Sequence, residues 1–212
     1  MQNNKLIQPH GGYKNLQSYQ MATIAQDFTV EFCNRYVSKY SRTVDQMVQA
    51  ARSGKQNIAE GSQASGTSQK TEIKLVNVAR ASLEELKADY EDFLRQKGLK
   101  QWGKDDSQAR ETRALAYKSN KTYTTYMTYM SDPETAANCA ICVINQANYL
   151  LDRQIASLEK KFLEKGGFTE RMHRTRQEQR KLQADRWGVF NKPVSEEEFR
   201  KQLEQDFDTS PE

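Results

Sequence analysis

The apolar residues of this chain recur every three or four positions over long stretches, and this spacing is typical of amphipathic α-helices. Four long stretches show it: residues 15–40, 43–61, 68–96 and 133–165. Proline seldom interrupts them, since the chain has only four prolines. The pattern therefore predicts an all-α protein built on four long helices.

Residues at the ends of these stretches match the preferences of helix termini. Ser41 or Thr43 is predicted to cap the second helix. Gly61 is predicted to end it, because glycine readily adopts the left-handed conformation that follows a helix. Gly98 is predicted to end the third helix in the same way. Asp132, followed by a proline at the first helical position, is a strong start for the fourth.

Residues 104–131 separate the third and fourth helices and are too many for a bundle turn, which takes about 2–8 residues. A short amphipathic helix is predicted around residues 109–116. Tyr123, Tyr126 and Tyr129 then continue at i, i+3 spacing. We therefore expect a helical insertion before the last helix of the bundle.

After residue 165 the chain changes character. Gly166 and Gly167 are predicted to break the fourth helix, and a further helix is predicted over residues 168–187. A short helix is expected to open at Ser195. Residues 171–186 hold six basic and two acidic residues, a net charge of +4, whereas residues 193–212 hold two basic and seven acidic residues, a net charge of −5. The basic block favours an anionic partner.

Composition narrows the class of protein. Hydrophobic residues make up 36% of the chain and charged residues 28%, and the mean hydropathy is −0.92, which favours long separate amphipathic helices. Three cysteines, an odd number, argue against a secreted disulfide framework. The first residues lack the apolar core of a signal peptide, and no run approaches the roughly 18 apolar residues that span a bilayer. We therefore expect a cytoplasmic protein.

One order of short motifs carries a resemblance. Arg52-Ser53 is followed by Asn57-Ile58-Ala59-Glu60-Gly61, by a stretch rich in Ser, Gly, Thr and Gln (residues 62–69), and by Ala81-Ser82-Leu83-Glu84-Glu85-Leu86. Over roughly residues 13–165 this order resembles the four-helix-bundle family first noticed in intervening sequences of bacterial 23S ribosomal RNA genes. That family includes the accessory variability proteins of diversity-generating retroelements. The segment Gly166-Gly167-Phe168-Thr169-Glu170-Arg171-Met172 looks like the suffix of one branch of the family.

The resemblance implies an antiparallel four-helix bundle over residues 15–165, after an N-terminal tail (1–14) and before a basic-then-acidic helical suffix (166–212). It also implies a ring-like homopentamer, and in some members a positive surface that meets nucleic acid and a reverse transcriptase. The chain departs from the family in its insertion and in Lys55-Gln56, which replaces the more usual proline-containing approach to Asn57.

Candidate nucleic-acid contacts come from two basic segments. On a helix, Arg171, Arg174 and Lys181 form one stripe, and Arg176 and Arg180 form a second, adjacent one. A second supply of cations lies in residues 97–121, beside tyrosines that could stack on unpaired bases. The alternative is an ordinary solvated helix with tyrosines packed on the bundle. The candidate residues are Arg171, Arg174, Arg176, Arg180, Lys181, Arg186, Lys118 and Lys121.

A group of acidic residues offers a different function. Glu85, Asp89 and Asp92 share one helix face, and helical nucleotide pyrophosphatases hold magnesium with such carboxylates. Those enzymes often use two acidic pairs, and only Asp89-x-x-Asp92 is convincing here. A polar face that pairs with neighbouring cations is the favoured interpretation, and a metal-dependent nucleotide hydrolase is the alternative function.

Three further motifs are weaker. Residues 61–68 have the glycine spacing of a P-loop, but Thr67 stands where lysine is required and the segment leaves a helix. Cys139-x-x-Cys142 lies inside an apolar run, so both thiols are expected in the core. Glu170-x-x-His173 is a single unit where di-iron bundles need two. We expect no metal, no cofactor and no catalytic step in this chain.

The helix after Pro133 is apolar nearly all round. Its apolar residues are Ala136, Ala137, Ala140, Ile141, Cys142, Val143, Ile144 and Ala147. Because three neighbouring helices cover mainly one broad face, the remaining face is predicted to meet another subunit. The leading hypothesis is a non-catalytic oligomeric scaffold that holds RNA or DNA, possibly for a reverse transcriptase. The other alternative is a protein–protein adaptor.

Overall fold

The computed structural model describes residues 7, 9–190, 196, 197 and 200 of the chain, with side chains described up to residue 187 and at 196, 197 and 200. Within these residues it contains six α-helices, two 3-10 helices and no strand, which confirms the predicted all-α fold. The four long helices of the bundle are α1 (Gln17–Tyr36), α2 (Arg42–Ala64), α3 (Gln69–Lys97) and α5 (Pro133–Lys165), and a short 3-10 helix, η1 (Tyr13–Asn15), precedes α1.

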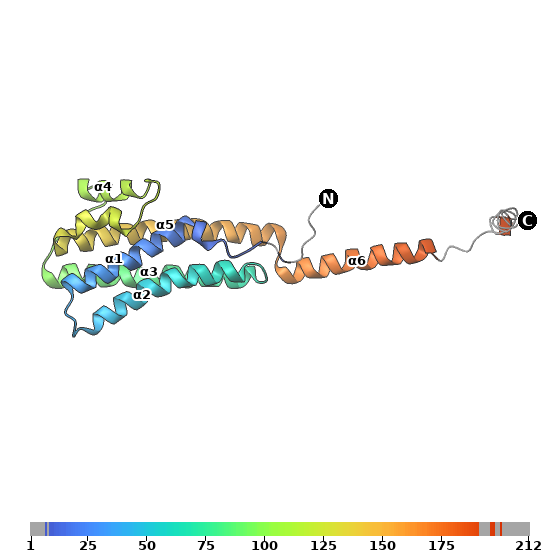
Figure 1. Ribbon diagram of the computed structural model, residues 1–212, viewed down its shortest axis with the longest axis horizontal. Coiled ribbons are helices and arrows are strands. Elements are labelled where there is room, and N and C mark those ends of the chain that lie inside the picture. The colour runs from blue at the N-terminus through green and yellow to red at the C-terminus, as the bar shows by residue number, and fades with distance from the viewer. Residues whose placement is uncertain (1–6, 8, 191–195, 198–199, 201–212) are drawn as a thin grey trace, which may run out of the picture. The chain divides into compact units, whose positions relative to one another are not determined.

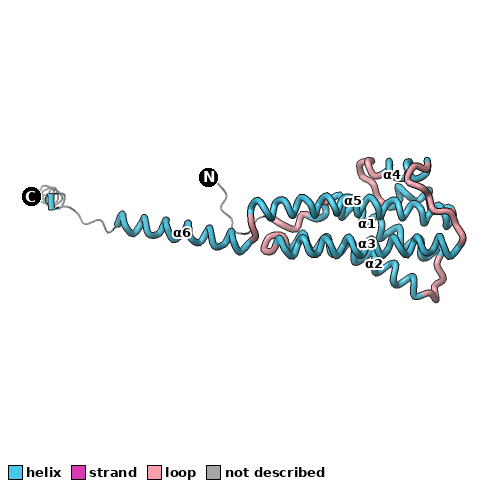
Figure 2. The backbone as a smooth tube through the Cα atoms, turned by 180° about the vertical axis from the view of Figure 1, so that it is seen from behind, coloured by secondary structure: helices cyan, strands magenta, loops and turns pink. Residues whose placement is uncertain are grey.

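The four long helices close into a bundle in chain order. α1 packs on α2 and α5, and α3 packs on the same two helices. Successive helices of the bundle run in opposite directions, and they lie side by side in both views (Figures 1 and 2). The antiparallel four-helix bundle expected from the sequence is therefore present.

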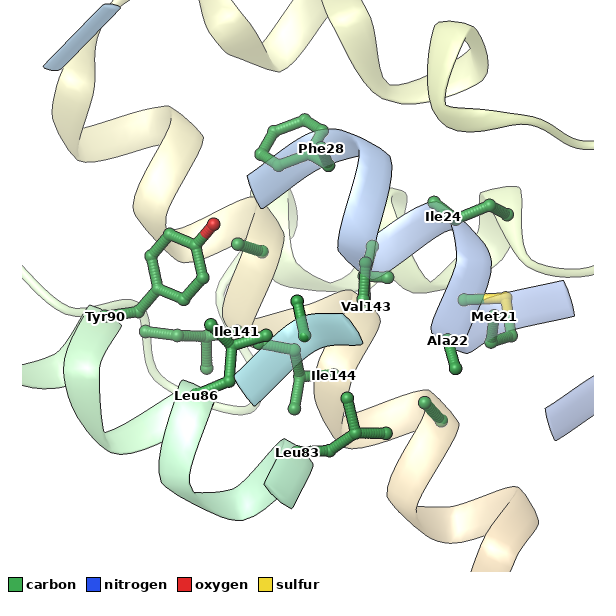
Figure 3. Packing of buried hydrophobic residues seen from close by; sticks show 14 of the residues in the cluster. Met21, Ala22, Ile24, Phe28, Leu83, Leu86, Tyr90, Ile141, Val143 and Ile144 are labelled. Carbon is green, nitrogen blue, oxygen red and sulfur yellow. The ribbon is translucent and has the colours of Figure 1, made fainter. Parts of the chain in front are cut away.

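The core of the bundle is aliphatic and aromatic. Figure 3 shows Leu86 and Tyr90 from α3 beside Ile141 and Ile144 from α5, with Phe28 of α1 on the opposite side. Tyr90 is fully buried, and its hydroxyl donates a hydrogen bond to Thr29 Oγ1 at 3.0 Å. A buried phenol thus keeps a polar partner, which removes most of the cost of placing it in the core.

Residues of the motifs that suggested a family lie where α2 packs on α3. Ser53 and Ser82 are hydrogen-bonded through their hydroxyls at 3.0 Å, and Asn57 Nδ2 donates to the Ser53 carbonyl at 2.9 Å. A Cβ atom on Gly54 would lie only 2.6 Å from Leu83 Cδ2. The small residues of α2 therefore allow the two helices to approach closely.

Gly61 does not end α2, contrary to the prediction. The helix continues to Ala64, and Gly61 is buried inside it. A Cβ atom there would lie 3.3 Å from the Glu72 carbonyl oxygen and 3.4 Å from Leu75 Cβ. This glycine thus serves close packing on α3 rather than a left-handed helix end.

The other helix ends follow the predicted signals with one exception. Ser41 caps α2 and accepts a hydrogen bond from the Thr43 amide, and Gly98 takes the left-handed conformation (φ 65°) after α3. Asp132 Oδ1 accepts from the Thr135 amide at 2.9 Å. The exception is α1, which was predicted to reach residue 40 but ends at Tyr36, because Val37 is already extended and residues 37–41 form the turn into α2.

The insertion packs on the bundle. It forms α4 (Ser107–Leu115) and the 3-10 helix η2 (Tyr123–Ser131), and both contact α5, while η2 also contacts α1. The i, i+3 spacing of the tyrosines suits a 3-10 helix, which has three residues per turn. Tyr126 and Met130 of η2 and Ala109 of α4 are buried.

The packing of the insertion bears on the prediction that an uncovered apolar face of α5 meets another subunit. All eight apolar residues of α5 that were expected to leave a face uncovered are buried within the single chain. The insertion lies over the face that was assigned to another copy. The all-round apolar character of α5 therefore requires no partner subunit.

The chain divides into two compact units, Met1–Phe168 and Thr169–Glu212. The helix α6 (Phe168–Phe190) starts where the sequence predicted and extends three residues beyond the expected end at Trp187. The short helix expected to open at Ser195 falls largely outside the described residues.

Candidate nucleic-acid interface

The basic residues predicted beyond residue 170 all lie on α6. Five of the six are exposed and form no ion pair with a residue that the structure describes: Arg174, Arg176, Arg180, Lys181 and Arg186. The sixth, Arg171, is half-buried. Exposed guanidinium groups can each donate two parallel hydrogen bonds to a phosphate.

These cations do not form one face of α6. At about 100° per residue, Arg176 and Arg180 lie roughly 130° around the helix from Arg174 and Lys181. The two stripes are therefore not adjacent, and the cations surround the helix. Such a distribution allows phosphate contacts from several directions but defines no single binding face.

Lys118 and Lys121 belong to the other compact unit. They lie in the segment between α4 and η2 and line a surface hollow of about 590 Å³ together with Tyr117. Lys121 Nζ donates a hydrogen bond to Gln17 Oε1 of α1 at 3.1 Å. The predicted residues are thus split between α6 and the insertion, each in its own compact unit.

Sequence reasoning missed a third contributor on α5. Asn145 and Tyr149 are exposed, and the guanidinium carbon of Arg153 lies 6.0 Å from the centroid of the Tyr149 ring. These residues follow at four-residue spacing after an almost continuous apolar run. The sequence could have indicated this polar face, because polar side chains at i, i+4 and i+8 after an apolar run share one side of a helix.

The acidic residues of α3 are only partly brought together. Asp89 and Asp92 line a hollow of about 370 Å³ beside the α1–α2 turn, whereas Glu85 does not line it. Asp92 Oδ1 pairs with the Arg95 guanidinium at 2.7 Å. Burial, followed by the charges of Glu85 and Asp92, raises the pKa of Asp89. Among the described residues no group of three or more His, Cys, Asp or Glu side chains is arranged to hold a metal ion.

Glu84, another acidic residue of α3, has a structural role. Glu84 accepts a hydrogen bond from Asn148 Nδ2 of α5 at 2.9 Å and pairs with Lys87. It thus joins α3 to α5. Two acidic residues of α3, Glu84 and Asp92, thus form ion pairs within the bundle unit.

The weaker motifs also occupy structural positions. Residues 61–64 of the P-loop-like segment are helical, and the rest forms the α2–α3 turn. Cys139 and Cys142 are free thiols buried in α5, and burial raises the pKa of each, that of Cys142 to about 11. His173 is exposed on α6.

Comparison with family models, with curated protein sequences and with solved structures finds no match to this chain. Among the described residues, no helix combines the length and apolar character needed to cross a membrane.

Proposed function

We propose that this protein is a non-catalytic nucleic-acid-binding scaffold of the cytoplasm in which α6 makes the principal phosphate contacts. The observation that carries the proposal is the concentration of exposed arginine and lysine side chains on α6 that pair with no described carboxylate. Exposed cations that no described carboxylate neutralises gain most when they meet the closely spaced charges of a nucleic-acid backbone.

The sequence resemblance supports the wider context of the proposal. It favours a homo-oligomer, five copies in a ring, and a reverse transcriptase as the protein partner. In such an assembly each copy would contribute one α6, so individually weak contacts would add through multivalency. A protein–protein adaptor with solubilising arginines is the competing function, and salt dependence separates the two.

The test reverses the charge of Arg174, Arg176 and Arg180 together to glutamate. Binding to unrelated RNA and DNA sequences should weaken about equally, because phosphate contacts carry no sequence information. The log–log dependence of affinity on salt should flatten by roughly 0.7 to 0.9 for each phosphate contact that is lost. Fluorescence anisotropy titrations at several salt concentrations measure both effects.

The matched control reverses three exposed cations of the bundle, Arg42, Lys70 and Lys74, and so changes the net charge equally. Equal loss of affinity in both triple variants would show that net charge alone, and not the position of the cations on α6, causes the effect. Unchanged binding in the α6 variant would overturn the proposal. Nucleotide turnover with Mg²⁺ that disappears in Asp89→Asn would contradict the non-catalytic assignment.

A further inference from the structure

Three hollows of the bundle unit share lining residues that come from the insertion and from α5. A first hollow of about 320 Å³ is lined by Trp102 and Lys104 and shares Arg113 and Asn145 with a second of about 410 Å³. The second hollow shares Tyr117 with the hollow of about 590 Å³ that Lys118 and Lys121 line. We call this joined surface the insertion groove.

Two tyrosine rings stand in the middle of the insertion groove. Tyr117 is 91% exposed and Tyr149 is 61% exposed, and both line the second hollow. Arg153 lies over the Tyr149 ring as a cation–π partner at 6.0 Å. Exposed rings keep a free face, and a free ring face can stack on any base.

The groove is also basic. Its lining includes the cations Lys104, Arg110, Arg113, Lys118 and Lys121. Its lining contains one carboxylate, that of Glu91, which accepts a hydrogen bond from Gln101 Nε2 at 3.2 Å.

Three other acids belong to the same segment of the chain. Asp106 is occupied by the Gly103 amide at 3.0 Å and by Lys100 Nζ at 3.6 Å, while Asp105 and Glu111 do not line the groove. Positive charge therefore prevails along its length.

The floor of the groove is held by hydrogen bonds. Gln146 Nε2 donates to the Arg113 carbonyl at 2.8 Å, and the Arg113 guanidinium donates to the Lys104 carbonyl at 2.6 Å. Asn138 accepts from the Trp102 amide at 2.7 Å and donates to the Lys100 carbonyl at 2.8 Å. These bonds fix α4 and the segment before it on α5 before any ligand arrives, which lowers the entropy cost of binding.

We propose that the insertion groove binds an unpaired nucleic-acid strand, with bases stacked on Tyr117 and Tyr149 and phosphates on Arg110 and the lysines at either end. Cations interleaved with free aromatic faces are the combination that single-stranded nucleic acid requires. A duplex keeps its bases stacked on one another and offers mainly phosphates to such a surface. The inference rests on the proposed function and adds a preference for single strands.

The experiment compares a labelled single-stranded RNA of about ten nucleotides, within the usual site size, with a duplex of the same length. Tyr117→Ala combined with Tyr149→Ala should weaken single-strand binding by about 5- to 100-fold for each ring that stacks. Duplex binding should change little. The double Phe variant keeps both rings and should bind the single strand as the unmodified protein does.

Tyr40→Ala is the matched control, because Tyr40 is 99% exposed in the α1–α2 turn and lines none of the three hollows. Equal thermal denaturation midpoints establish that the variants are folded. Unchanged single-strand affinity in the double Ala variant would overturn the inference, as would an equal loss of duplex binding.

The outcomes also separate the two proposals. If charge reversal on α6 weakens binding while the tyrosine variants do not, the proposed function stands and the groove is not a strand-binding site. If neither set has an effect, both proposals fail. If the tyrosine variants instead reduce self-association in light scattering, the groove is an interface between copies of this chain and the inference is wrong.

Discussion

At the scale of single residues, the cysteines show how burial sets chemistry. Cys33, Cys139 and Cys142 are all free and buried. Burial raises the pKa of Cys33 to about 11, with a further contribution from the charge of Asp89. Burial likewise raises the pKa of Cys142 to about 11. It raises the pKa of Cys139 well above the usual value of a cysteine. Only the thiolate is nucleophilic, so these residues act as small core side chains.

We expect all three thiols to react slowly in the folded protein. At pH 8 a thiol with a pKa of about 11 is roughly one part in a thousand thiolate, against about a quarter for a free cysteine. Reaction with a chromogenic disulfide should therefore be at least about a hundredfold slower than in the same protein unfolded in urea, which is the control. A thiol of the folded protein that reacts as fast as free cysteine would contradict the burial of that thiol in α1 or α5.

The same groups make stability fall at alkaline pH. Because the folded-state pKa of Cys33 and of Cys142 is raised, their contribution to the free energy of unfolding is complete below about pH 8.5. It is lost as the pH rises toward 11. The thiol measurements should therefore be made below about pH 8.5, where this contribution to stability is complete.

At the scale of elements, the contact between α2 and α3 depends on the sizes of two residues, Gly54 and Leu83. Leu83 is fully buried. A Cβ atom added to Gly54 would lie only 2.6 Å from Leu83 Cδ2, which is too close for the two atoms to coexist without a shift. The Ser53–Ser82 hydrogen bond lies beside this pair. The close approach of the helices therefore requires both a glycine in α2 and the packing of a leucine in α3.

A double-mutant cycle tests this pair. Gly54→Ala should lower the free energy of unfolding by about 1 kcal/mol, because overpacking costs about 1–3 kcal/mol and the gain in helix propensity is at most about 1 kcal/mol. Leu83→Ala alone should cost about 2–5 kcal/mol. In the Leu83→Ala background the Gly54→Ala change should become stabilising, because the space is now free.

Urea denaturation measures the cycle. Asn77→Ala, at an exposed position of α3, is the control and should add to Leu83→Ala within about 0.5 kcal/mol. Additive effects of Gly54→Ala and Leu83→Ala would show that the two residues do not compete for the same space.

At the scale of the whole molecule, the bundle core is complete without α6. Among the described residues, the last one of that core or packed at its edge is Leu158. The second compact unit begins at Thr169. Stability and the phosphate contacts proposed for α6 are therefore expected to depend on different parts of the chain.

Deleting residues 168–212 should leave the thermal denaturation midpoint within a few degrees of that of the full chain, because no core side chain is removed. Nucleic-acid affinity should fall, since the cations of α6 are lost. Light scattering of both forms measures the number of copies, for which the sequence resemblance alone favours more than one. A midpoint lowered by more than about 10 °C would mean that α6 stabilises the bundle.

The sequence alone determined most of the helices and their ends, because these depend on interactions within a few residues. Ser41, Asp132 and Gly98 act at the predicted ends for the expected local reasons. The cations of α6 were also predictable, since charged side chains remain at the surface. Their distribution around the helix follows from the helical repeat.

The tertiary structure decided what depends on residues far apart in the chain. Gly61 continues a helix because α3 lies against it, a contact that no local signal encodes. The apolar face of α5 is covered by the chain's own insertion rather than by another copy. The insertion groove joins Tyr117 to Tyr149, which are distant in sequence, and only packing of the insertion on α5 brings such residues to one surface.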